Sequence, residues 1–84
     1  MADVKLYTAT YCGYCKRALQ LLDTKQVKYT NIDVTDDQAL RQEMQTISGR
    51  TTVPQIFING QHIGGCDDLH ALEASGELDK LLQN

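Results

Sequence analysis

The alternation of strand-like and helix-like segments is the feature that most limits how this chain can fold. Apolar and polar residues alternate over residues 4–9 and again over residues 27–34. Between these two stretches, leucines recur at helical spacing from about Gly13 onward. Strands separated by a helix are expected to run parallel, joined by a right-handed crossover. The pattern therefore predicts an α/β fold in which helices cover the faces of a sheet.

A second helix is predicted to follow the second strand. Apolar residues recur at helical spacing from residue 39 to residue 47, and Gly49 follows as a residue that commonly ends helices. Asp36 or Asp37 stands in the position of a residue that caps the start of this helix.

A hairpin is predicted from the middle of the second half. Residues 55–58 form a short apolar stretch, and Asn59–Gly60 follows as a strong signal for a two-residue turn. We expect residues 61–65 to return antiparallel to the first strand of this hairpin.

A last helical region completes the predicted topology. It runs through apolar residues 69–82, is interrupted near Gly76, and has Asp67 or Asp68 as its predicted cap. The order is β-α-β-α-β-β-α, which gives a four-stranded mixed sheet. At 84 residues, the chain is expected to form one domain, residues 1–84.

Composition and charge exclude several classes of protein. The net charge of −3 argues against nucleic acid as a partner, because phosphate binding favours a basic surface. No signal peptide is visible, and no stretch approaches the roughly 20 apolar residues that cross a membrane. Three cysteines, an odd number, argue against a secreted disulfide scaffold. We therefore expect a cytoplasmic protein that binds neither membranes nor nucleic acids.

The cysteines of the stretch YCGYC form the strongest chemical motif. Cys12 falls where the first strand ends and a helix begins, where free N–H groups stabilise a negatively charged sulfur. Cys15 follows three residues later on the same helix face, within reach of a disulfide. Lys16 and Arg17 oppose the helix dipole but attract anions. This combination favours a redox site.

The sequence gives less support to two other roles of the cysteines, a zinc site and a structural disulfide. Cys12 and Cys15 together with Cys66 and His70 would formally supply four zinc ligands, but the two halves lie far apart in the sequence. A purely structural disulfide between Cys12 and Cys15 would close a very short loop and constrain the unfolded chain little. We therefore predict no metal site.

Three motifs in register resemble the dithiol glutaredoxin family along nearly the whole chain. They are YCGYC after the first strand, GRTTVPQIFI over residues 49–58, and IGGCDDL over residues 63–69. The resemblance implies a thioredoxin fold and glutathione-dependent thiol–disulfide oxidoreduction, with Cys12 as the nucleophile and Cys15 as the resolving thiol. It implies glutathione and disulfide-containing or glutathionylated proteins as partners, glutathione reductase as an indirect one, and a monomer.

The resemblance also implies a glutathione site. Its residues would be Tyr14, Arg41, Thr52, Val53, Pro54, Gly65, Cys66 and Asp67. In the family the bond before the proline is cis, and the residue before it pairs with the glutathione backbone. The N–H groups of Cys66 and Asp67 would hold the γ-glutamyl carboxylate, and the Asp67 side chain would accept its ammonium group.

The chain departs from the family pattern in two places. Ala9 stands where many members have a lysine that binds the glycine carboxylate of glutathione, so Arg41 is predicted to carry that contact alone, unless it is only a solvated surface charge. Gly13 replaces the proline of the usual C-P-Y-C motif. Some members with a small residue there hold a [2Fe–2S] cluster between two subunits, so a cluster carrier or sensor is the alternative function. No tightly bound cofactor is otherwise expected.

Overall fold

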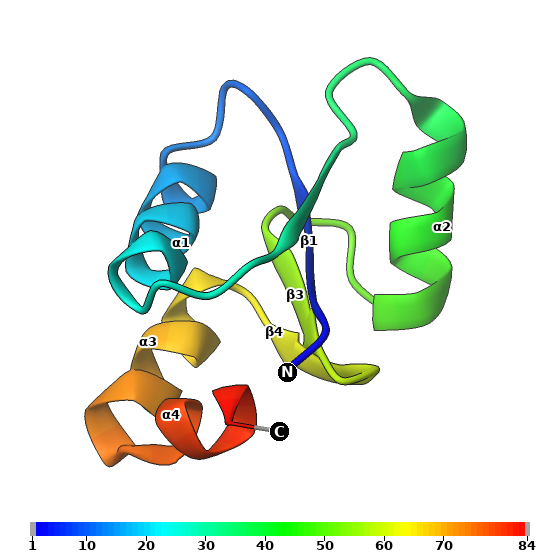
Figure 1. Ribbon diagram of the computed structural model, residues 1–84. Helices are drawn as coiled ribbons and strands as arrows, with labels where there is room; N and C mark the ends of the chain where they lie inside the picture. The colour runs from blue at the N-terminus through cyan, green and yellow to red at the C-terminus, as the bar shows by residue number, and fades with distance from the viewer. Residues whose placement is uncertain (1, 84) are drawn as a thin grey trace.

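The computed structural model describes residues 2–83, in which a four-stranded sheet lies between two layers of helices (Figure 1). Helix α2 covers one face of the sheet, and α1, α3 and α4 lie on the other side (Figure 1). In chain order the elements are β1 (Val4–Thr8), α1 (Gly13–Thr24), β2 (Thr30–Asp33), α2 (Gln38–Ser48), β3 (Gln55–Ile58), β4 (Gln61–Gly64), α3 (Cys66–Ser75) and α4 (Glu77–Leu82). The predicted order and the mixed sheet are confirmed.

Two apolar clusters hold the helices on the sheet. Buried side chains of β1 and β3 point alternately to its two faces, as the period of a strand requires. The larger cluster packs α1, α3 and α4 on one face; its buried members are Val4, Leu6, Ala18, Leu22, Ile56, Ile58, Cys66, Leu69 and Leu78. The smaller cluster lies under α2 and contains Tyr7, Val34, Met44 and Phe57.

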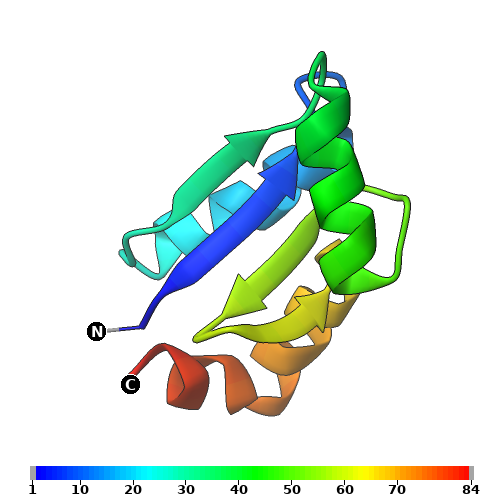
Figure 2. The same ribbon diagram turned by 90° about the vertical axis from the view of Figure 1, so that its right-hand side faces the viewer.

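The direction of β3 differs from the expectation for strands separated by a helix. The strand order is β2-β1-β3-β4, and β1 pairs parallel with β2 as predicted. Strand β3, however, runs antiparallel to β1, with Val4 opposite Ile58 and Tyr7 opposite Gln55. After α2 the chain returns along the helix before it enters β3 (Figure 2). Because of this return, β3 begins beside the end of β1, where the cysteine pair follows.

Strand β2 is shorter than the predicted strand over residues 27–34. Gln26 has a positive φ of 60°, so the chain turns sharply after α1 before it rejoins the sheet at Thr30. Val27 and Tyr29 pack against the larger apolar cluster during this passage. Their spacing imitates a strand because both side chains face the core, although their backbone lies outside β2.

The turn and helix signals of the second half locate most of the boundaries. Asn59 and Gly60 both have positive φ values, 53° and 81°, which a two-residue hairpin turn with the twist of its strands requires. Helix α2 ends at Gly49, and Gly76 separates α3 from α4. Within residues 2–83, no helix has the length and apolar character needed to cross a membrane.

Asp37, rather than its neighbour Asp36, caps α2. Its side chain accepts a hydrogen bond of 2.9 Å from the N–H of Leu40. Asp37→Ala should therefore lower the free energy of unfolding by about 1 kcal/mol, measured by chemical denaturation. Asp36→Ala is the matched control and should cost less, because it removes a charge near the helix start but no cap bond. Equal losses from the two variants would contradict the assignment of the cap.

Candidate active site

Cys12 is the residue that caps the start of α1. Its backbone is extended (φ −98°, ψ 114°), and its sulfur accepts a hydrogen bond from the N–H of Cys15 at 3.2 Å. The sulfur is partly exposed and lies at the positive end of the helix dipole. A sulfur in this position can act as a nucleophile toward molecules in solution, because it is reachable and its negative charge is stabilised.

Cys15 lies one turn deeper and differs sharply from Cys12. Its side chain is 1% exposed. Burial raises the pKa of the Cys15 thiol to about 12, and the neighbouring Cys12 adds to the rise. Cys15 therefore stays protonated at neutral pH while Cys12 faces the solvent. No disulfide joins Cys12 and Cys15 in the structure.

The loop before β3 contacts the Cys12 sulfur. The Cys12 sulfur lies 3.5 Å from the backbone oxygen of Val53, and the thiol donates to it. The Val53–Pro54 bond is cis, as the family resemblance implies. The sequence distance between the two contact partners is 41 residues, and the antiparallel direction of β3 brings them together.

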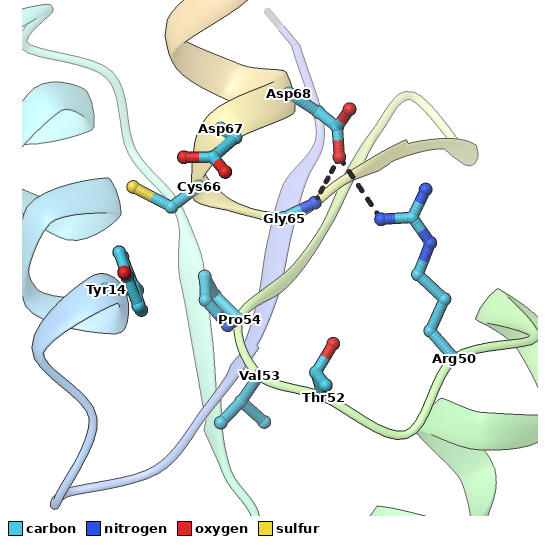
Figure 3. A pocket seen from close by; sticks show the side chains of 9 residues that line it. All are labelled: Tyr14, Arg50, Thr52, Val53, Pro54, Gly65, Cys66, Asp67 and Asp68. Carbon is cyan, nitrogen blue, oxygen red and sulfur yellow. Dashed lines mark hydrogen bonds and ion pairs between the residues drawn. The ribbon is translucent and has the colours of Figure 1, made fainter.

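A pocket of about 320 Å³ opens beside this contact (Figure 3). Its walls come from three segments: the first turn of α1, the loop before β3, and the start of α3. Nine residues line it: Tyr14, Arg50, Thr52, Val53, Pro54, Gly65, Cys66, Asp67 and Asp68. Tyr14 and Arg50 stand at opposite sides, with Pro54 between them (Figure 3). Tyr14 is 59% exposed, so a large apolar ring is available to a ligand.

The residue that caps α3 differs from the prediction. Gly65, and neither Asp67 nor Asp68, is the residue at the cap position. Asp68 lies in the first turn and its carboxylate accepts the N–H of Gly65 at 2.9 Å, which is the reverse half of a capping box. A side chain at Gly64, whose φ is 124°, would collide with this carboxylate. The acidic residues were placed correctly near the helix start, but their backbone is already helical.

An ion pair joins two walls of the pocket. Arg50, from the loop after α2, reaches the same Asp68 oxygen that accepts from Gly65, at 3.2 Å (Figure 3). The Gly65 N–H, and second the Arg50 guanidinium, hold the pKa of Asp68 below its ordinary value. Arg50 also offsets one of the two carboxylates at this end of the pocket. Sequence reasoning missed Arg50 altogether; it named Asp68 only as a candidate helix cap and missed its place in the pocket and its ion pair.

Seven of the eight predicted binding residues line the pocket, and Arg41 does not. Arg41 borders a separate hollow with Asp36 and Asp37 at the start of α2. Its guanidinium donates to the Tyr11 hydroxyl at 2.9 Å. Because Tyr11 directly precedes Cys12 in the sequence, this hydrogen bond connects Arg41 to the segment that carries the nucleophile candidate.

Cys66 and His70 are explained without a metal. Cys66 is 5% exposed, and burial raises the pKa of its thiol. Its sulfur lies 3.4 Å from Nδ1 of His70, one helical turn along α3. Over residues 2–83, no three His, Cys, Asp or Glu side chains gather as a metal site would require. The four-ligand zinc set considered from the sequence is thus not assembled.

Comparisons with known proteins agree on one family. The family model described as Glutaredoxin matches residues 4–63. The chain is 55% identical over 83 residues to Glutaredoxin 3 of Escherichia coli K12, covering 99% of this chain and 100% of that protein. It is 51% identical over 82 residues to Glutaredoxin of Pseudomonas aeruginosa, covering 98% of each.

Solved structures share the fold. The crystal structure of a buckwheat glutaredoxin–glutathione complex superposes with a TM-score of 0.90 at 33% identity, covering 98% of this chain and 77% of that one. The solution structure of glutaredoxin from Brucella melitensis has a TM-score of 0.86 at 54% identity, covering 98% and 89%. The predicted thioredoxin-like fold is therefore confirmed.

The contribution of Asp68 to stability should depend on pH. Because its pKa is lowered in the folded protein, its contribution is fully present above its ordinary value of 3.8 and is lost as the pH falls through the lowered value. Asp68→Ala should therefore be less stable than the parent at pH 7, and the gap should close in acid. Urea denaturation over a pH series measures it. Asp67→Ala, with an exposed carboxylate in the same turn, is the control; a pH-independent gap for Asp68→Ala would contradict the capping role.

Proposed function

The chain belongs to the glutaredoxin family and is a glutathione-dependent thiol–disulfide oxidoreductase, and we propose that Cys12 is its nucleophile and Cys15 its resolving thiol. The single observation that carries this assignment is the contrast in environment. Cys12 is partly exposed and accepts a helix N–H, whereas Cys15 is buried with a pKa raised to about 12.

The chemistry follows from that contrast. The Cys12 thiolate attacks one sulfur of a substrate disulfide; the substrate S–S bond breaks, and the other sulfur leaves as a thiolate that takes up a proton. A mixed disulfide on Cys12 results. Cys15, once it loses its proton, attacks the Cys12 sulfur, releases the second thiol and forms the Cys12–Cys15 disulfide. Two glutathione molecules in sequence then reduce the Cys12–Cys15 disulfide to the dithiol and leave as glutathione disulfide. Alternatively, one glutathione thiolate attacks the mixed disulfide directly and frees the Cys12 thiolate, without forming the Cys12–Cys15 disulfide.

We propose that the pocket holds glutathione as the substrate part of this mixed disulfide. The free N–H groups of Cys66 and Asp67 at the start of α3 suit the γ-glutamyl carboxylate. The Asp67 carboxylate, exposed in the same turn, would accept the ammonium group. The backbone of Val53 would pair with the peptide as an added strand does, with the Tyr14 ring as a wall.

We infer that residues 1–84 act as one glutaredoxin domain, as a monomer in the cytoplasm. Its partners would be disulfide-containing or glutathionylated proteins, with glutathione reductase acting indirectly through the glutathione pool. The [2Fe–2S] alternative stays a prediction of the sequence; visible absorbance of anaerobically purified protein would test it.

Replacing each cysteine separately tests the assignment of roles. Cys12→Ser should abolish turnover of every disulfide substrate, because the buried Cys15 is neither reachable nor ionised at neutral pH. Cys15→Ser should keep reduction of glutathione mixed disulfides and lose most reduction of protein disulfides, which needs the second thiol. Steady-state assays with one substrate of each kind measure both effects. The roles are reversed if the Cys12 variant stays active and the Cys15 variant does not.

Two arginine variants test which cation binds the glycine carboxylate. Ala9 is buried and uncharged, so we expect Arg41 to supply the charge. A charge-assisted contact at an exposed site contributes up to about 1.5–3 kcal/mol, less once screened. Arg41→Gln should therefore lower kcat/KM for a glutathione mixed disulfide by about tenfold.

Arg50→Gln is the matched comparison and should lose less, because Arg50 is engaged by Asp68. Both variants should be measured at low and high salt, where screening reduces the difference. The opposite ranking would assign the carboxylate to Arg50.

A further inference from the structure

Gln55 is a polar side chain buried completely at the start of β3. Its exposed fraction is 0%, in a strand whose other three residues are apolar. Burying an amide costs free energy unless its donors and acceptor find partners. An apolar residue at this position would avoid that cost, so the contacts that Gln55 makes are informative.

Both ends of the Gln55 amide are engaged. Its nitrogen donates to the backbone oxygen of Thr52 at 2.9 Å and lies 3.3 Å from the Thr52 hydroxyl. Its oxygen lies 2.7 Å from Nε2 of His62 on β4. The amide therefore links the second strand of the hairpin to the loop that forms a wall of the pocket.

The direction of these hydrogen bonds fixes the proton on His62. The Gln55 nitrogen must face the Thr52 oxygen, which only accepts, so the Gln55 oxygen faces His62. Nε2 of His62 must then carry a hydrogen, and it does so in the neutral Nε2–H tautomer as well as in the imidazolium ion. The ring is held against Phe57, with centroids 5.0 Å apart.

The Thr52 carbonyl belongs to the peptide group that also contains the Val53 N–H. This peptide is trans, so its C=O and N–H point in opposite directions. With the C=O held by Gln55, the Val53 N–H points away from the Gln55 side chain. Rotation of this peptide would break the bond to Gln55 and leave a buried amide unsatisfied.

We propose that Gln55 is a positioning residue that fixes the Thr52–Val53 peptide for pairing with the peptide backbone of the substrate. This inference rests on the proposed function, because it assumes that glutathione pairs with Val53. Gln55 touches neither substrate nor sulfur. Its effect should therefore appear only with substrates that carry a peptide backbone.

The test compares two disulfides in single-turnover reactions of the reduced protein. One is a mixed disulfide of glutathione and cysteine, which has a peptide backbone; the other is bis(2-hydroxyethyl) disulfide, which has none. Gln55→Met removes both hydrogen bonds at similar volume. Gln55→Glu keeps the acceptor toward His62 but places an oxygen against the Thr52 carbonyl. Ile56→Val is the matched control, a buried change on the same strand in a side chain that belongs to the larger apolar cluster.

We expect Gln55→Met and Gln55→Glu to lower the rate constant for the glutathione substrate by about tenfold and to leave the other rate constant within about twofold. Ile56→Val should lower the unfolding midpoint without changing the ratio of the two rates. The proposal is overturned if the Gln55 variants slow both substrates equally or neither. Gln55→Glu decides the matter if Gln55→Met does not fold. A parent protein that does not react with the glutathione substrate would instead overturn the proposed function.

Discussion

The pairing of β3 with β1 in opposite directions is the constraint on which the site depends. Tyr7, near the end of β1, lies opposite Gln55, at the start of β3. The segment that follows β1 and the segment that precedes β3 therefore meet at the same end of these two central strands. Cys12 arrives from β1 and Val53 from the loop before β3, and they touch although they are distant in the sequence. If β3 ran parallel to β1, the loop before β3 would lie at the opposite end of the strands, away from Cys12.

Much of this arrangement could be predicted from local patterns. The strand alternation, the Asn59–Gly60 turn, the glycine that ends α2, and the cysteine pair at a helix start each depend on neighbouring residues only. The direction of β3 could not be obtained in this way, because it depends on the path of the loop after α2. The rule for parallel strands joined through a helix describes β1 and β2, which are adjacent; β2 and β3 are not neighbours in the sheet.

The residues that sequence reasoning missed are those whose roles arise between segments. In the sequence Arg50 looks like an ordinary surface charge and Asp68 like a helix cap, and their ion pair forms only where α3 meets the loop before β3. The cap of α3 was misplaced because two aspartates are common caps, while Gly65 gives no side-chain signal. Arg41 shows the reverse case: the family pattern implied a binding residue, and the structure locates it beside Tyr11 and outside the pocket.

The starts of two helices, α1 and α3, lie at the site. The start of α1 places the N–H of Cys15 on the Cys12 sulfur, and the start of α3 lies at the other side of the pocket, where we propose that its N–H groups bind a carboxylate. A γ-glutamyl thiol carries both groups that these ends favour, one sulfur and one carboxylate. An α3 start with two uncompensated aspartates would repel such an anion. Arg50 pairs with Asp68 and offsets one of those two negative charges, so we expect the ion pair to reduce the repulsion between this helix start and an anionic ligand.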